Sequence, residues 1–301
     1  MEVQLNEVIN KEEVRVTPEE KEVKADKSTQ FKLDLSRQAK LIPKEKIDNW
    51  NVEVFGVGSV GSHVVDCLAK SGFKSIKVYD MDVVSEENIA PQAFNIEHIE
   101  MLKVDAVKDI AKRAAGLTIQ TSSDKITDKT KIVLEPLTMY CCFFDSLEAR
   151  KLIFNQCKGN PVIYVDGRIG KYDIRYYLVD CMNKEEVADY ETTLDTRVQS
   201  DQVCGEKACA PVNRVISGHI VMQMVNFISE NDYIKTFIGN LAMPTMDIAI
   251  VKETTKKREL TADQRENLNY EIENQAVADS GVEEENDNED EDNPEPQDED
   301  D

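Results

Sequence analysis

The chain has 301 residues, of which 41% are hydrophobic and 32% charged, and its formal net charge at pH 7 is −23. This length can bury the core of one large domain or of two small ones. No apolar run approaches the ~20 residues of a membrane span, and the first residues lack the apolar core of a signal peptide, so we expect a cytoplasmic protein without membrane contact. The acidic balance argues against DNA binding, which needs clustered Lys and Arg.

The negative charge is concentrated near the C-terminal end of the sequence. Residues 283–301 carry 13 acids and no base, which leaves −10 of the total −23 for the remainder. Such a segment buries too little apolar surface to offset the entropy of ordering, so we predict a disordered acidic tail over 266–301. The tail serves solubility or docks a basic partner. Residues 1–30, rich in Glu and Lys, are predicted to form a flexible arm, and 31–265 the folded domain.

A strand, a glycine-rich turn, a helix and a second strand are predicted over residues 52–82. The apolar run Val52–Phe55 leads into the motif Gly56-x-Gly58-x-x-Gly61, and apolar residues at helical spacing follow. Gly56 would permit the tight turn, and Gly58 would let the backbone approach a phosphate. Gly61 would let the helix pack closely on the sheet. This context predicts a nucleotide at the N-terminus of the helix.

An acid closes this unit. Asp80 follows the apolar strand Ile76–Tyr79, roughly 20 residues after the last glycine, where an acid typically accepts hydrogen bonds from ribose hydroxyls. The unit by itself fits an ATP-using enzyme and an NAD-dependent oxidoreductase equally well.

The rest of the sequence alternates between helical and strand patterns, which predicts an α/β, Rossmann-like, mainly parallel sheet with flanking helices. Cysteines, seven in number, are scattered through these elements and suit reduced thiols. In chain order we predict a loop over 83–95, a helix over 96–115, strands near 117–121 and over 139–144, a helix over 146–157, strands over 162–165 and 173–179 around a turn at 167–170, a buried helix over 215–228 that follows Pro211, and a strand over 247–251.

Three further segments carry a resemblance to a known family. Asp80-x-Asp82-x-Val84, Asn88 and Gln92 follow the second strand in order, the segment IEMLKVDAVKDI supplies Lys103, and FFDSLEAR supplies Asp145 and Arg150. In this combination the chain resembles the ThiF/MoeB family of ubiquitin-activating-enzyme-like adenylyltransferases, over roughly 36–227.

The resemblance implies an enzyme that uses Mg-ATP to adenylate a carboxylate, that of the C-terminal glycine of a ubiquitin-like or sulfur-carrier protein, with release of pyrophosphate. It implies that Gly56, Gly58, Gly61, Asp80 and Asp82 seat the nucleotide, that Asn88, Gln92 and Lys103 hold phosphates, and that Asp145 binds magnesium. Independently, nucleotidyl transfer builds negative charge that cations must offset. Without the resemblance, Lys103 is a solvated helix lysine and Asp145 a helix N-cap.

The resemblance also implies a homodimer, because in this family an N-terminal arginine reaches the neighbouring subunit's triphosphate; here Arg37 is the candidate. Two features depart from the family. Pro91 stands where many relatives carry Arg, and Arg168 or Lys171 could replace that cation. Paired Cys-x-x-Cys motifs are absent, so no structural zinc is expected.

A cysteine nucleophile is implied only for members that pass the adenylate on to a thiol. Cys204 is the best candidate, since it lies in a Gly-containing loop near Lys207, and Cys209 directly precedes an apolar helix whose N-terminus could lower a thiol pKa. Two other functions stay open. A nucleotide-binding scaffold without catalysis would explain Pro91, and an NAD-dependent oxidoreductase would explain the glycine motif but not Lys103 or Asp145.

Overall fold

The computed structural model describes residues 33–194 and 209–242, and the backbone of 247–254. Contacts divide the chain into two units, Met1–Thr255 and Lys256–Asp301, and every described residue belongs to the first. The predicted arm over 1–30 and tail over 266–301 lie outside the described residues, so the predicted domain boundaries stay predictions.

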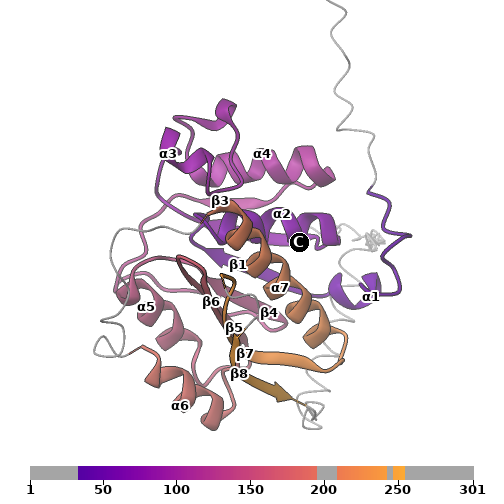
Figure 1. Cartoon of the computed structure of the whole chain (residues 1–301), viewed down its shortest axis with the longest axis vertical. Helices are drawn as coiled ribbons and strands as arrows, with labels where there is room; N and C mark the ends of the chain where they lie inside the picture. Colours follow the sequence, from indigo (N-terminus) through magenta and orange to yellow (C-terminus); the bar gives the residue numbers. More distant parts are fainter. Residues whose placement is uncertain (1–32, 195–208, 243–246, 255–301) are drawn as a thin grey trace, which may run out of the picture. The chain divides into compact units, whose positions relative to one another are not determined.

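Within the described residues, one sheet of eight strands occupies the centre of the first unit, in the order β3-β2-β1-β4-β5-β6-β7-β8 (Figure 1). The strands from β3 to β5 pair in parallel, and those from β5 to β8 pair antiparallel. This arrangement confirms the predicted Rossmann-like α/β class and adds an antiparallel extension. The strands are β1 (Asn51–Phe55), β2 (Ser75–Tyr79), β3 (Gln120–Ser122), β4 (Thr138–Cys142), β5 (Ile163–Gly170), β6 (Asp173–Asp180), β7 (Tyr233–Asn240) and β8 (Asp247–Thr254).

Helices cover both faces of the sheet. On one face lie α2 (Gly61–Ser71), α4 (Lys103–Ala115) and α7 (Ala210–Ile228), and on the other lie α5 (Leu147–Cys157) and α6 (Lys184–Thr192) (Figure 1). Strand β4 shows why both faces need cover, because Met139 and Cys141 enter the first core while Tyr140 and Cys142 enter the second. A buried parallel strand is therefore apolar at every position, as its sequence indicated.

The helix predicted over 96–115 is shorter than its apolar pattern suggested. Residues Ile96–His98 form a 3-10 turn, Glu100 has a φ of 70°, and α4 begins only at Lys103. The backbone of Lys103 donates to the Asp82 carbonyl at 2.9 Å, so this segment is tied back to the end of β2. The apolar spacing predicted a buried face of Ile99, Leu102, Ala106, Ile110 and Ala114. In the structure Ala106 is buried as predicted and Leu102 and Ile110 are partly buried, whereas the other buried positions of α4 are Lys103, Val104, Val107, Ala111 and Ala115.

Other elements also differ from the predictions. The loop predicted over 83–95 contains a short helix, α3 (Glu86–Ile89), and a further short helix, α1 (Lys44–Ile47), precedes β1. Strand β5 continues to Gly170 and β6 begins at Asp173, so the turn predicted at 167–170 lies at residues 171 and 172. Helix α6 and strand β7 were not predicted, because neither has a clear apolar period.

Candidate active site

Part of the predicted site, the glycine turn and Asp145, lies where the strand order changes direction. Strands β1 and β4 are neighbours, yet the chain leaves β1 toward β2 and leaves β4 toward β5. Phe55 and Cys142 pair at the carboxyl ends of these strands, so the glycine turn after β1 lies beside the segment Phe143–Asp145. In open α/β sheets, this switch point is the place where ligands bind.

The glycine turn is closely packed at two of its three glycines. Gly56 has a φ of 89°, and a Cβ there would lie 2.9 Å from the backbone nitrogen of Phe144. A Cβ on Gly61 would lie 1.9 Å from the Gly56 carbonyl oxygen, whereas one on Gly58 would meet nothing within 4 Å. The turn therefore requires glycine at 56 and 61 for packing, and at Gly58 it leaves open space of the kind that a phosphate needs.

The Asp80 carboxylate braces this turn from the end of β2. One oxygen accepts from the Val57 amide and the other from the Asp82 amide, each at 2.9 Å. Burial raises the pKa of Asp80, although these two hydrogen bonds and the nearby Lys103 oppose the shift. Each carboxylate oxygen has a second lone pair, so Asp80 can hold the turn and still accept from a ribose hydroxyl.

Lys103 is buried at the first position of α4. Its ammonium donates to the Asp82 carboxylate at 2.7 Å, and its side chain is 11% exposed. The prediction of a solvated helix lysine in the absence of the family is therefore wrong, and Lys103 and Asp82 lie together beside Asp80. Asn88 is also buried, and its Oδ1 accepts from the Ser85 amide as part of a capping box at α3.

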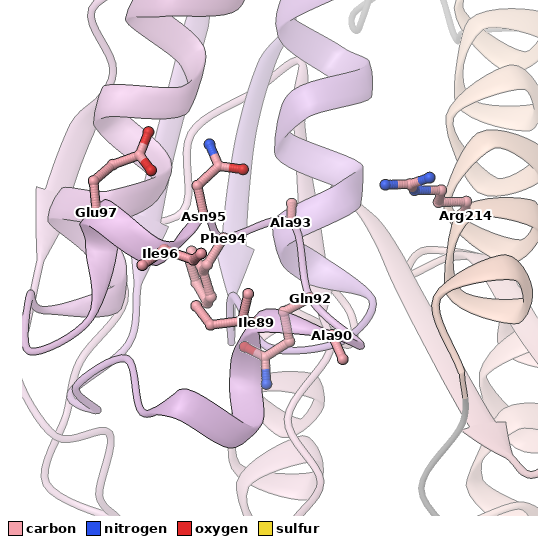
Figure 2. A pocket seen from close by; sticks show the side chains of 9 residues that line it. All are labelled: Ile89, Ala90, Gln92, Ala93, Phe94, Asn95, Ile96, Glu97 and Arg214. Carbon is pink, nitrogen blue, oxygen red and sulfur yellow. The ribbon is translucent and has the colours of Figure 1, made fainter. Parts of the chain in front are cut away.

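Gln92 follows α3 and lines a pocket of about 460 Å³ with residues that include Phe94, Ile96, Glu97 and Arg214 (Figure 2). Arg214 projects from α7, a long way along the sequence, toward the segment that contains Gln92 (Figure 2). The Gln92 Oε1 atom is buried and has no hydrogen-bond partner within the described residues. A buried acceptor without a partner marks a position where a ligand can contribute a donor.

Asp145 is exposed at the β4–α5 junction. The helix N-cap is its neighbour Ser146, whose Oγ accepts from the Ala149 amide at 3.2 Å, so the N-cap alternative for Asp145 is wrong. No hydrogen bond or ion pair engages Asp145 in the described part of the chain. Its carboxylate is therefore available to a cation.

Arg150, five residues after Asp145, is buried and holds the start of α5 against β5. Its guanidinium forms an ion pair with Asp166 and donates to the Gly167 carbonyl at 3.2 Å. Asp166 is fully buried and also accepts from Arg168 and from the Tyr190 hydroxyl, at 2.7 and 2.8 Å. A buried carboxylate on β5 thus lies between two arginines, opposite Cys142 at the end of β4.

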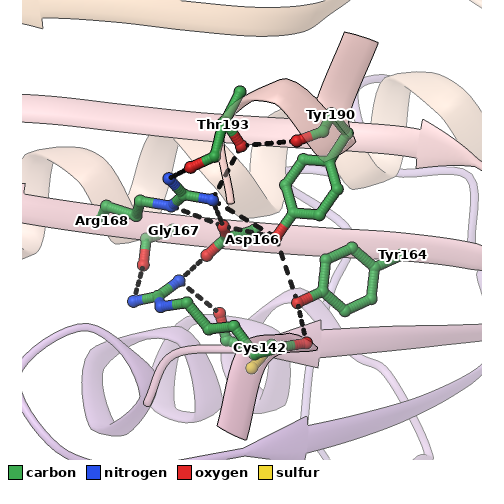
Figure 3. A network of polar contacts seen from close by, with 8 residues as sticks. Cys142, Tyr164, Asp166, Gly167, Arg168, Tyr190 and Thr193 are labelled. Carbon is green, nitrogen blue, oxygen red and sulfur yellow. Dashed lines mark hydrogen bonds and ion pairs between the residues drawn. The ribbon is translucent and has the colours of Figure 1, made fainter. Parts of the chain in front are cut away.

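Arg168 does not replace the cation that Pro91 removes. Its guanidinium donates to Asp166, to the Thr193 carbonyl at 2.9 Å and to the Thr193 hydroxyl at 3.0 Å, and only 7% of its side chain is exposed (Figure 3). The alternative that assigned Arg168 to a phosphate is therefore wrong. Lys171 lies in the β5–β6 turn with a φ of 54°.

Arg37 lies away from the glycine turn of its own chain. The neighbouring Gln38 donates to the Lys70 carbonyl, which lies in the last turn of α2, at 2.9 Å. The 11 residues of α2 separate that end from the turn by about 16 Å. Cys204 lies outside the described residues, and Cys209 is the exposed N-cap of α7.

Sequence reasoning missed two residues that contact the Gln92 segment. Asn213 on α7 and His63 on α2 both lie within hydrogen-bonding distance of the Pro91 carbonyl oxygen, at 2.6 and 3.3 Å. One signal was present for Asn213, an amide on the buried face of an otherwise largely apolar helix. No signal in the sequence connected His63 to Pro91.

The residues at this edge fit a nucleotide better than they fit a metal alone. In the described part of the chain, no group of three or more His, Cys, Asp or Glu side chains could hold a metal ion. A cation at Asp145 would therefore need further ligands, and phosphate oxygens can supply them. The open space at Gly58 fits the phosphates of such a ligand, and the unpartnered Gln92 Oε1 can accept from one of its hydroxyl or amino groups.

The fold and this edge define a Rossmann-like α/β protein whose glycine turn, acidic strand end and exposed aspartate meet at the switch point. The sequence profile of the ThiF family matches residues 30–262. The chain belongs to the ThiF family.

Two curated relatives show how much of the chain is similar to known members of the family. The chain is 33% identical over 102 residues to the NEDD8-activating enzyme E1 catalytic subunit of Schizosaccharomyces pombe, a match of 33% of this chain and 23% of that protein. It is 26% identical over 192 residues to ubiquitin-like modifier-activating enzyme 5 of Arabidopsis thaliana, or 58% of this chain and 40% of that protein. The matched regions thus span less than half of these relatives.

Solved structures show the same fold. Escherichia coli MccB, crystallised with AMPCPP and MccA, superposes with a TM-score of 0.54 at 17% identity, over 70% of this chain and 66% of that one. PaaA superposes with a TM-score of 0.52 at 18% identity, over 72% and 67% of the two chains. No helix in the described ranges has both the length and the apolar character required to cross a membrane.

Proposed function

We propose that this chain is a Mg-ATP-dependent adenylyltransferase that activates a carboxylate. The observation that carries the proposal is the meeting of four features at one switch point: the glycine turn, Asp80, Lys103 with Asp82, and the exposed Asp145. Membership of the ThiF family supports it, and so do relatives named as activating enzymes for ubiquitin-like proteins.

Each residue has a role that its surroundings permit. Asp80 accepts from the ribose while it braces the turn, and Gly58 admits the phosphates. Lys103 has three ammonium protons, so it can keep its bond to Asp82 and also donate to a phosphate oxygen. Asn88 and Gln92 contribute further contacts from α3 and the segment after it. In the reaction the carboxylate oxygen of the acceptor attacks the α-phosphate, and pyrophosphate leaves.

Asp145 would hold magnesium together with phosphate oxygens, and the ion would offset the charge that develops during transfer. The first turn of α5 supports this role indirectly. Because Arg150 ties α5 to β5 through Asp166 and Gly167, the segment that carries Asp145 has a fixed anchor. A carboxylate so anchored keeps its position when a ligand binds.

The acceptor in this proposal is the C-terminal glycine of a ubiquitin-like or sulfur-carrier protein, and the protein acts as a cytoplasmic homodimer. Arg37 would serve the partner subunit, because it lies at the far end of α2 from its own glycine turn. A thioester at Cys204 or Cys209 stays a further possibility of the same scheme.

The decisive experiment replaces Asp145 with Asn, which keeps the shape and removes the charge. We expect ATP-dependent pyrophosphate release with magnesium to fall at least about 100-fold, because the transition-state charge loses its cation. Asp232→Asn, an exposed acid at the opposite edge of the sheet, is the matched control and should leave turnover unchanged. Full activity of Asp145→Asn would show that the metal site is elsewhere.

A catalytically weak nucleotide-binding scaffold is the second candidate, favoured by Pro91 and by the engagement of Arg168 with Asp166 and Thr193. Such a protein would bind ATP without releasing pyrophosphate. Calorimetric titration with ATP and with NAD, in the presence of magnesium, separates the candidates. Selective NAD binding would instead support the oxidoreductase.

A further inference from the structure

The backbone on both sides of Gln92 is held by side chains from two helices. The Pro91 carbonyl accepts from the Asn213 amide at 2.6 Å and lies 3.3 Å from His63 Nε2. On the other side, the Ala93 amide donates to the Ser62 hydroxyl at 3.0 Å. Both peptide groups that flank Gln92 are therefore fixed, one to α7 and α2, the other to α2.

The hydrogen-bond roles at Pro91 are determined by chemistry. A carbonyl oxygen only accepts, so His63 must carry its proton on Nε2. Burial lowers the pKa of His63, and the charge of Arg214 lowers it further, so the ring is neutral at pH 7 with Nδ1 unprotonated. Proline has no amide proton of its own, so its carbonyl is the only hydrogen-bonding group at position 91.

Asn213 lies at a position that is unfavourable for a polar side chain. It is fully buried, and its Oδ1 atom has no hydrogen-bond partner within the described residues. An unpartnered buried acceptor destabilises the folded state, and an apolar residue on this face of α7 would avoid that loss. The bond to Pro91 is the interaction that offsets this cost.

The side-chain amide of Gln92 has a donor that is not engaged. Its Oε1 atom is buried without a partner, and no hydrogen bond engages its Nε2 atom in the part of the chain that the structure describes. Gln92 lines the pocket (Figure 2), and because its flanking peptides are held, the contacts at Pro91 and Ala93 set the position from which this side chain projects. An unengaged N–H donor that projects from a held backbone is suited to a phosphate oxygen.

We propose that Asn213 and His63 are positioning residues that clamp the Pro91 carbonyl and thereby aim Gln92 at the phosphates of the nucleotide. The proposal rests on the adenylyltransferase function and adds the first turns of α7 and α2 to its site. Neither Asn213 nor His63 touches the nucleotide in this arrangement. Both act through Gln92.

The test uses the full chain with Asn213→Leu, which keeps the volume and removes the donor. Gln223→Leu is the matched control, because Gln223 is also a buried amide on α7 that makes one bond to backbone, accepting from Ile234 at 2.9 Å. It lies ten residues further along, about 15 Å away. Both variants should lose similar stability, but only Asn213→Leu should raise the KM for ATP, by about tenfold, with kcat within about twofold.

Two further measurements distinguish a positioning role of Asn213 from a general loss of stability. Asn213→Leu should add no further loss to Gln92→Ala, because the two substitutions remove the same contact. Asn213→Asp should be impaired at pH 8 and recover as the pH falls, because only a protonated carboxyl can donate to Pro91. Additive losses in the double variant, or a flat pH profile of Asn213→Asp relative to wild type, would overturn the proposal.

Hydrogen exchange of the Gln92 and Ala93 amides tests the clamp without nucleotide. These amides should exchange faster in Asn213→Leu than in Gln223→Leu. If they do not, the clamp is wrong even when ATP turnover by the wild type is normal. If wild-type protein neither binds ATP nor releases pyrophosphate, the proposed function fails together with the nucleotide role of Gln92, while faster exchange would still show the clamp.

Discussion

At the scale of single residues, the three glycines of the turn differ in what they tolerate. Gly56 and Gly61 are required by backbone conformation and by contact distances, whereas Gly58 faces open space. The motif predicted all three glycines, but it did not distinguish packing from ligand access. That distinction depends on atoms from Phe143 and Phe144, which come from the end of β4.

We therefore predict opposite outcomes for two alanine substitutions. Gly58→Ala should keep its stability within about 0.5 kcal/mol, because its Cβ meets no neighbour, but should weaken ATP binding by obstructing the phosphates. Gly61→Ala should lose several kcal/mol, on the order of a severe overpacking, since its Cβ would overlap the Gly56 carbonyl. Urea denaturation and calorimetric titration measure the two quantities. Loss of stability in Gly58→Ala would contradict the open geometry.

A pH-dependent effect is expected at Glu53, a partly buried carboxyl on β1. Burial raises its pKa above the ordinary 4.5, although the Tyr79 hydroxyl, which donates to it at 2.7 Å, opposes the shift. The folded state then binds the proton more tightly than the unfolded state. The contribution of protonated Glu53 to the free energy of unfolding is complete below about pH 4.5, and it is lost as the pH rises through the raised pKa.

Glu53→Gln removes this dependence and keeps an oxygen for Tyr79. Its melting temperature should exceed that of the wild type at pH 7 and approach it near pH 4. Glu45→Gln, at an exposed position of α1, is the control, and its melting temperature should follow that of the wild type at both pH values. A variant less stable than wild type at pH 7 would show that ionised Glu53 is stabilised by its neighbours.

At the scale of elements, the start of each helix depends on contacts that the local pattern does not contain. The apolar spacing over 96–115 favours a single helix, yet the chain turns at Glu100 and begins α4 at Lys103, because Lys103 is bonded to Asp82 through both backbone and side chain. Likewise, α5 is held at its start by Arg150, whose partners Asp166 and Gly167 lie on β5.

The Asp166 network provides an element-scale prediction. Asp166→Asn would leave Arg150 and Arg168 buried with no opposing charge, so the protein should lose about 3–5 kcal/mol in urea denaturation. Asp124→Asn, at an exposed position, serves as the control and should change stability by less than about 0.5 kcal/mol. A small effect at Asp166 would mean that the network adds specificity to the packing of α5 without adding stability.

At the scale of the whole molecule, the position of Arg37 bears on assembly. Arg37 lies at the end of α2 opposite the glycine turn, so under the proposed function we expect its contact with a triphosphate in a neighbouring subunit. The ThiF family assigns the fold, and the homodimer is part of the proposed function. Subunit complementation can test this assembly directly.

We predict that Arg37→Ala and Asp145→Asn are each inactive and that their equimolar mixture regains activity. If subunits exchange at random, half of the dimers are mixed and each carries one intact site, so about a quarter of wild-type activity should return. Mixing each variant with itself is the control. No recovery after verified subunit exchange would mean that both residues serve the site of their own subunit, or that Arg37 has no part in the mechanism.

The sequence by itself determined the fold class, the glycine turn and the order of Asp80, Lys103 and Asp145, because these follow from local periodicity and from motif spacing. Tertiary structure alone decided which side chains meet. It put Asn213 and His63 on Pro91, and it committed Arg168 to Asp166 and Thr193. The physical reason is that hydrogen bonds and ion pairs between distant segments depend on the packing of α2, α5 and α7 on the sheet, which no local pattern encodes.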